Sequence, residues 1–224
     1  MQHFFEELDA LNGHLLEMTG LVEDSIHRSV IAVVNNDDHA AQQVFENESR
    51  INQLEILIDD AAIRLLALQH PVAVDLRFVT MSMKINNNLE RMGDIAVNIA
   101  QRAISLLSSS AIVPKVDIPH MARLAEDMIR NSIDAFLRRD TELAKKVLTS
   151  DDAVDRLRDE MYSEIVGYME QDSSRIHPGI DYIFVARGLE RLADHATNIA
   201  EDVLFFVQGI DVRHNMQKDP LQAP

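Results

Sequence analysis

The sequence predicts an all-α protein made of two tandem, sequence-related antiparallel three-helix bundles, with six long helices in all. Three observations lead to this fold class. The 224 residues include only 7 Gly and 6 Pro, so the chain is poor in the residues that form turns between strands. Apolar residues recur at steps of three and four, which is the helical period. One twelve-residue motif occurs twice, one hundred residues apart, which indicates a duplicated unit.

The first half is predicted to contain three helices. The first covers 5–35, and Asn36, Asp37 and Asp38 make a corner after it. The second runs from that corner to Pro71, because proline cannot continue a helix. The third covers about 74–107.

The segment 108–119 (SSSAIVPKVDIP) has the composition of a linker, since it holds three serines and two prolines at the midpoint of the chain. Beyond it the helical pattern starts again, with helices predicted from about 120 to 138, from the break at Arg139 and Asp140 to about 169, and from 178 to 207. We therefore expect a first bundle over 1–110, a second bundle over 117–214 and a mobile tail over 215–224.

Charge and composition exclude several classes of protein. With 37 Asp and Glu against 21 Lys and Arg, the net charge is -16, which disfavours nucleic acid, anionic lipid and direct phosphate binding without a bound cation. The absence of cysteine excludes disulfides and thiolate metal sites. No stretch of about 18 apolar residues occurs, and the N-terminus lacks the pattern of a signal peptide. We expect a soluble cytoplasmic protein without membrane insertion.

The repeated motif carries the candidate chemistry. It reads LERMGDIAVNIA at 89–100 and LERLADHATNIA at 189–200, with eight of twelve positions identical. Each copy holds two acids four residues apart, which lie on one face of a helix, and the middle helix of each half holds a similar pair. Carboxylates that converge from two helices suit Mg, Mn, Ca or ferric iron. The candidate metal ligands are Glu55, Asp59, Glu90, Asp94, Asp155, Asp159, Glu190 and Asp194, and Asp151 extends one row by a turn.

A solvated helix face is the alternative to a metal site, because acids at this spacing also arise by chance in so acidic a chain. The repetition of Glu, Arg, Asp and Asn in register in both halves favours a functional role over this alternative. His195 points about 100° away from Asp194 around the helix, so we expect it to be a packing residue and not a ligand.

Motifs for catalysis are missing. No Glu has His three residues later, as a ferritin-like di-iron site would need, and the phosphate-binding loop, serine elbow and His-Glu-x-x-His motifs do not occur. We therefore predict that the protein is not an enzyme. A metal-dependent enzyme would have to use His195 as its general base.

The segment PVAVDLR at 71–77 and the two copies of the repeated motif resemble the PhoU family of phosphate-transport regulators, and the resemblance covers nearly the whole chain. It implies two three-helix bundles and negative regulation of the phosphate-starvation response. It further implies a protein that links the ATPase subunit of a phosphate ABC transporter to a sensor histidine kinase. Apolar strips on long amphipathic helices favour a homodimer, although the same residues could be buried within each bundle. Some family members bind iron or other metals through acid-x-x-x-Asp motifs, so the eight acids above would hold iron, manganese, magnesium or zinc.

One segment departs from the first-half pattern. HPGID at 177–181 stands where the first half has its proline-to-arginine segment, so the two sites are not expected to be equivalent. Apart from the resemblance, the residues leave open a metal-free helical scaffold or adaptor without a phosphate role.

Overall fold

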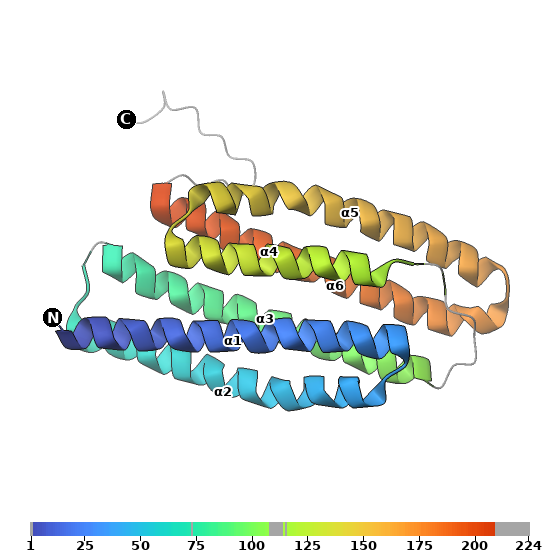
Figure 1. Ribbon diagram of the computed structural model, residues 1–224, viewed down its shortest axis with the longest axis horizontal. Coiled ribbons are helices and arrows are strands. Elements are labelled where there is room, and N and C mark those ends of the chain that lie inside the picture. Colours follow the sequence, from blue (N-terminus) through green and yellow to red (C-terminus); the bar gives the residue numbers. More distant parts are fainter. Residues whose placement is uncertain (1, 73, 108–113, 115, 209–224) are drawn as a thin grey trace, which may run out of the picture.

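The structure, a computed structural model, describes residues 2–72, 74–107, 114 and 116–208. In this part of the chain all regular structure is helical (Figure 1). The elements are α1 (Gln2–Asn35), α2 (Asp38–Gln69), α3 (Val74–Leu107), α4 (Ile118–Arg138), α5 (Thr141–Glu170), the 3-10 turn η1 (Ser173–Arg175) and α6 (Ile176–Gln208). The predicted fold class is confirmed. The predicted tail 215–224 and most of the predicted linker 108–119 lie outside the described residues.

Local signals set the corners between the helices. Asp37 and Asp140 cap α2 and α5, because their side chains accept hydrogen bonds from main-chain N–H groups of the first turns. Asn36 and Arg139, which precede these caps, have φ of 52° and 55°, a left-handed conformation that ends the preceding helix. Asp117 caps α4, so this helix begins at Ile118, earlier than the start predicted at 120.

The six helices form two layers of three. α1, α2 and α3 pack on one another, and α4, α5 and α6 do the same. Each bundle buries one apolar stripe per helix, and Leu54 and Leu192 are examples of side chains with no exposed surface. Burying such a leucine contributes roughly 2 kcal/mol. None of the helices in the described residues is long and apolar enough to cross a membrane.

The two bundles meet chiefly along α3 and α6, which run antiparallel (Figure 1). Lys84 on α3 contacts Asp202 on α6, with Nζ and Oδ1 3.0 Å apart. The corresponding pair of positions also meets on these two helices. There the guanidinium carbon of Arg102 on α3 lies 4.5 Å from the ring centre of Phe184 on α6. Since 84 matches 184 and 102 matches 202 in the duplication, an approximate two-fold axis relates the halves.

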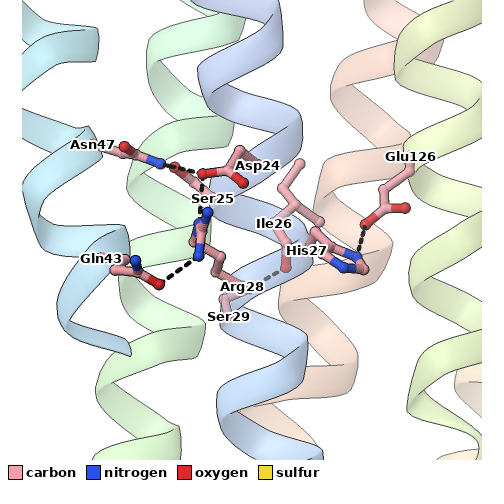
Figure 2. A network of polar contacts seen from close by, with 9 residues as sticks. All are labelled: Asp24, Ser25, Ile26, His27, Arg28, Ser29, Gln43, Asn47 and Glu126. Carbon is pink, nitrogen blue, oxygen red and sulfur yellow. Dashed lines mark hydrogen bonds and ion pairs between the residues drawn. The ribbon is translucent and has the colours of Figure 1, made fainter. Parts of the chain in front are cut away.

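A second, polar contact joins α1 to α4. His27 Nδ1 lies 3.7 Å from Glu126 Oε1, as Figure 2 shows, and Arg130 pairs with Glu23 at 3.2 Å. On another flank of α1, Arg28 and Asn47 both donate hydrogen bonds to Asp24, which ties α1 to α2. The helix α1 therefore uses one side for its own bundle and another for the opposite bundle.

Gly188 permits the close approach of α6 to α3. A Cβ atom at this position would lie 2.9 Å from Cγ1 of Ile99. We predict that Gly188→Ala lowers the free energy of unfolding by about 1 kcal/mol, since overpacking outweighs the gain in helix propensity. Gly167→Ala is the matched control, because no atom lies within 4 Å of its Cβ position. Gly167→Ala should raise stability by up to about 1 kcal/mol in urea unfolding, and equal effects of the two variants would contradict the prediction.

Candidate functional site

The first-half acids gather where α2 packs against α3. Glu55 and Asp59 come from α2, and Glu90 and Asp94 come from α3. Burial raises the pKa of Glu90, and the neighbouring charges of Asp94 and Glu55 raise it further. The charges of Glu55 on α2 and of Asp94 on α3 therefore both act on Glu90.

Asn86 joins this first-half group one turn before Glu90. Its side chain is 1% exposed, and Nδ2 donates hydrogen bonds of 2.9 Å to Asp59 Oδ1 and to the main-chain oxygen of Glu55. Its Oδ1 is buried and has no hydrogen-bond partner among the described residues. Asn86 therefore joins α3 to α2 beside the acids and leaves one buried oxygen unsatisfied, which is costly.

The second-half acids are arranged around an arginine. Arg158 Nη1 lies 2.7 Å from Asp155 Oδ1 and 2.7 Å from Glu190 Oε1, and Nη2 lies 3.0 Å from Asp159 Oδ1. Burial lowers the pKa of Arg158, but hydrogen bonds to Asp159 and Glu190 raise it to a net value above the usual one. The guanidinium group thus stands among three of the four predicted ligands of this half.

Arg158 does not neutralise the whole second-half group. Burial raises the pKa of Asp151 to about 6, and the charges of Asp155 and Asp194 add to this effect. Burial and the charge of Glu190 likewise raise the pKa of Asp194. The group therefore carries more negative charge than its arginine balances.

The difference between the halves arises on one row of the middle helix. The N-caps Asp37 and Asp140 and the buried rows align α5 with α2 so that Val154 and Met161 match Ile51 and Ile58, and Arg158 therefore stands where α2 has Glu55. Sequence reasoning missed Arg158 as a partner, although a signal was available. An arginine three residues after Asp155, on the acidic face of the same helix, indicates a charge facing carboxylates.

We tested whether the acids fit a metal ion. In residues 2–72, 74–107, 114 and 116–208, no three carboxylate or histidine side chains converge closely enough, as they lie, to hold one. The donor set of the first half nevertheless fits a cation chemically, since it consists of oxygen atoms, carries mutual repulsion at Glu90 and has no arginine such as Arg158 inside it. The second half fits less well, because Arg158 already supplies the positive charge.

His195 lies at the contact between the two bundles. Its Nδ1 is 2.9 Å from Oδ1 of Asn88 on α3. Burial lowers the pKa of His195 to about 4, and the charges of Arg191 and Arg91 add to the effect. The ring is therefore neutral at neutral pH and joins α6 to α3 through a partner that no sequence pattern indicates.

These features define a class of proteins made of two related three-helix bundles, with acids at matched positions of the last helix of each bundle. Comparison with known proteins identifies the class more closely, because the family model described as PhoU domain matches residues 15–103 and 118–203. The chain belongs to the PhoU family.

Relatives and solved structures agree with this assignment. The chain is 40% identical over 215 residues to the phosphate-specific transport system accessory protein PhoU homolog of Pseudomonas putida, covering 95% of this chain and 84% of the relative. It is 32% identical to PhoU of Escherichia coli K12, with coverage of 94% and 88%. The crystal structure of PhoU from Pseudomonas aeruginosa superposes with a TM-score of 0.88 at 39% identity, covering 92% of this chain and all of that chain. The phosphate transport system regulatory protein PhoU from Streptococcus pneumoniae gives 0.85 at 29% identity, with coverage of 93% and 99%.

The raised pKa of Asp151 leads to a prediction for metal-free protein. A folded-state pKa near 6, against 3.8 in the unfolded chain, means that the ionised carboxylate destabilises the folded state above about pH 6. Asp151→Asn should therefore raise the free energy of unfolding by about 1 to 2 kcal/mol near pH 7, a value reduced for partial exposure. The gain should shrink as the pH falls below 6 and disappear at about pH 3, because Asp151 is then largely protonated in both the folded and the unfolded state.

Urea unfolding at about pH 7 and about pH 3 measures this gain, and Glu160→Gln is the matched control. Glu160 is exposed on the same helix and is not among the charges that raise the pKa of Asp151, so the same change in charge should alter stability little. A gain at Asp151 that did not depend on pH would contradict the electrostatic cause.

Proposed function

We propose that this chain is a non-enzymatic negative regulator of phosphate uptake and of phosphate-starvation signalling. In this proposal it links the ATPase subunit of a phosphate ABC transporter to a sensor histidine kinase on the cytoplasmic side of the membrane. The observation that carries the proposal is membership of the PhoU family over both halves, together with relatives of nearly the same extent that are named as transport accessory and regulatory proteins.

The surface supports a role in binding partners. Ile56 and Ile63 on α2 are 64% and 53% exposed, and seven residues separate them, so they lie on one outer face of the first bundle. Leu68 and Val72, further along the chain, are 68% and 74% exposed. Exposed apolar side chains in such number favour contact with another protein, either a second copy in a homodimer or a component of the transporter.

The acidic clusters support a role for metal ions. We propose that the first-half set of Glu55, Asp59, Glu90 and Asp94 holds an iron, manganese, magnesium or zinc ion through oxygen atoms. A bound cation would neutralise the carboxylates and so remove the repulsion that raises the pKa of Glu90. In the second half, Asp155, Asp159, Glu190 and Asp194 would hold a metal only after Arg158 had moved from its place between them.

Deletion of the gene in its own organism tests the regulatory role. We expect genes of the phosphate-starvation response to be transcribed at high phosphate in the deletion strain, because the inhibitory link to the kinase is lost. Complementation with the parent gene should restore repression. Unchanged transcription at high phosphate would contradict the assignment and favour a scaffold without a phosphate role.

Elemental analysis of protein purified without chelator tests the metal role. The parent should contain metal, and Glu90→Ala with Asp94→Ala should lose it. The matched pair Glu190→Ala with Asp194→Ala should retain it, because Arg158 occupies that half. Arg158→Met should increase the metal content by freeing the second-half carboxylates. A parent without metal after incubation with ferric, manganous, magnesium and zinc ions would reduce the clusters to solvated faces and support a metal-free adaptor.

A further inference from the structure

A hollow lined by three arginines lies where the two bundles meet. Its volume is about 260 Å³, and one row of residues from α3 and one from α6 line it. Its charged residues are Arg102, Arg187 and Arg191, and no acid lines it. In a chain with a net charge of -16, this concentration of positive charge without a lining carboxylate is a local reversal of sign.

The duplication supplies an internal reference for this arginine hollow. A second hollow, between the matching parts of α3 and α6, has Lys84, Glu201 and Asp202 as its charged residues. Lys84 pairs with Asp202 there, whereas the position that corresponds to Asp202 in the arginine hollow is Arg102. Arg187 likewise takes the place of a neutral Asn87. The two halves therefore share a backbone arrangement but have opposite charge at matching hollows.

Arg102 is held in place by its surroundings. Its guanidinium group stacks 4.5 Å from the ring centre of Phe184 and lies 3.4 Å from Oδ1 of Asp181. Asp181 is 8% exposed and also accepts a hydrogen bond of 2.8 Å from Ser105. Two groups of α6 thus fix this α3 side chain, so that little side-chain entropy remains to be lost when it binds an anion.

Arg187 and Arg191 remain available for a ligand. Neither side chain makes an ion pair with a carboxylate among the described residues, and both are exposed at the mouth of the hollow. Asp194 lies one turn from Arg191 and lowers the local potential without contacting the guanidinium group. Each of the two guanidinium groups has five N–H donors, and such a group can donate two parallel hydrogen bonds to the oxygen atoms of a phosphate.

We propose that the arginine hollow binds a phosphoryl oxyanion, either free inorganic phosphate or a phosphoryl group carried by another molecule. The hollow is large enough for one phosphoryl group with its waters. Three arginine side chains, from α3 and α6, surround this space. Binding there would bridge the two bundles at α3 and α6. The choice of phosphate over other oxyanions rests on the proposed function. The binding of an anion rests only on the charge and shape of the hollow.

Isothermal titration of the purified full chain with inorganic phosphate, at constant ionic strength against chloride, tests the proposal. We expect saturable binding to one site, weakened by about tenfold or more in the double variant Arg187→Gln with Arg191→Gln, since each charged contact contributes substantially. The charge-matched control is Arg91→Gln with Arg123→Gln, which removes two exposed arginines outside the hollow. Arg91 corresponds to Arg191 in the duplication, and the control should bind within about twofold of the parent.

A second titration with phosphoserine distinguishes the two sources. Binding of phosphoserine but not of inorganic phosphate, lost in the Arg187 and Arg191 variant, would assign the hollow to a phosphoryl group on a partner. Absence of saturable binding with both probes, or equal weakening in the control variant, would overturn the proposal. Because these titrations use purified protein and the regulatory role is tested by transcription in a deletion strain, each can fail without the other.

Discussion

The close antiparallel contact between α3 and α6 is the interaction on which the rest of the structure depends. Gly188 lets α6 approach Ile99, and Phe78 of α3 stacks on Phe136 of α4 with ring centres 4.7 Å apart. Phe206 of α6 completes this aromatic cluster. A side chain of the first bundle is thus buried in the second, and neither bundle can rotate without exposing large apolar rings. Every polar feature between the bundles is positioned by this apolar contact.

Duplication followed by divergence explains why the two halves differ in chemistry although they share a fold. The middle helices keep the same spacing of buried residues, with Ile51 and Ile58 matched by Val154 and Met161, so the partly buried Glu55 and its counterpart Arg158 face the same neighbouring helix. A charge can occupy such a position only if it finds a partner. Arg158 finds Asp155 and Glu190, and it thereby relieves a repulsion that the first half leaves uncompensated around Glu90.

The sequence predicted the fold class and the corners between helices because each depends on local periodicity or on a few adjacent residues. The corner at Asn36 and Asp37, which the structure places between α1 and α2, is of this kind. The spacing of Glu90 and Asp94 likewise depends on one helix alone, and the charge of Asp94 raises the pKa of Glu90. The sequence could not predict His195 beside Asn88, or Arg102 against Phe184, because those contacts depend on the register between two helices that are distant in sequence. A shift of one turn along α6 would exchange all of these partners while leaving the periodicity intact.

Net charge and local charge lead to different conclusions about ligands. A charge of -16 spread over the surface weakens long-range attraction for any anion, but salt screens such fields beyond about 8 to 10 Å. Inside the hollow formed by Arg102, Arg187 and Arg191, contact distances are shorter than this screening length, so the nearest guanidinium groups dominate. An acidic protein can therefore hold an anion where two helices bring arginines together, and the surrounding acids slow the approach of the anion more than they weaken the bound state.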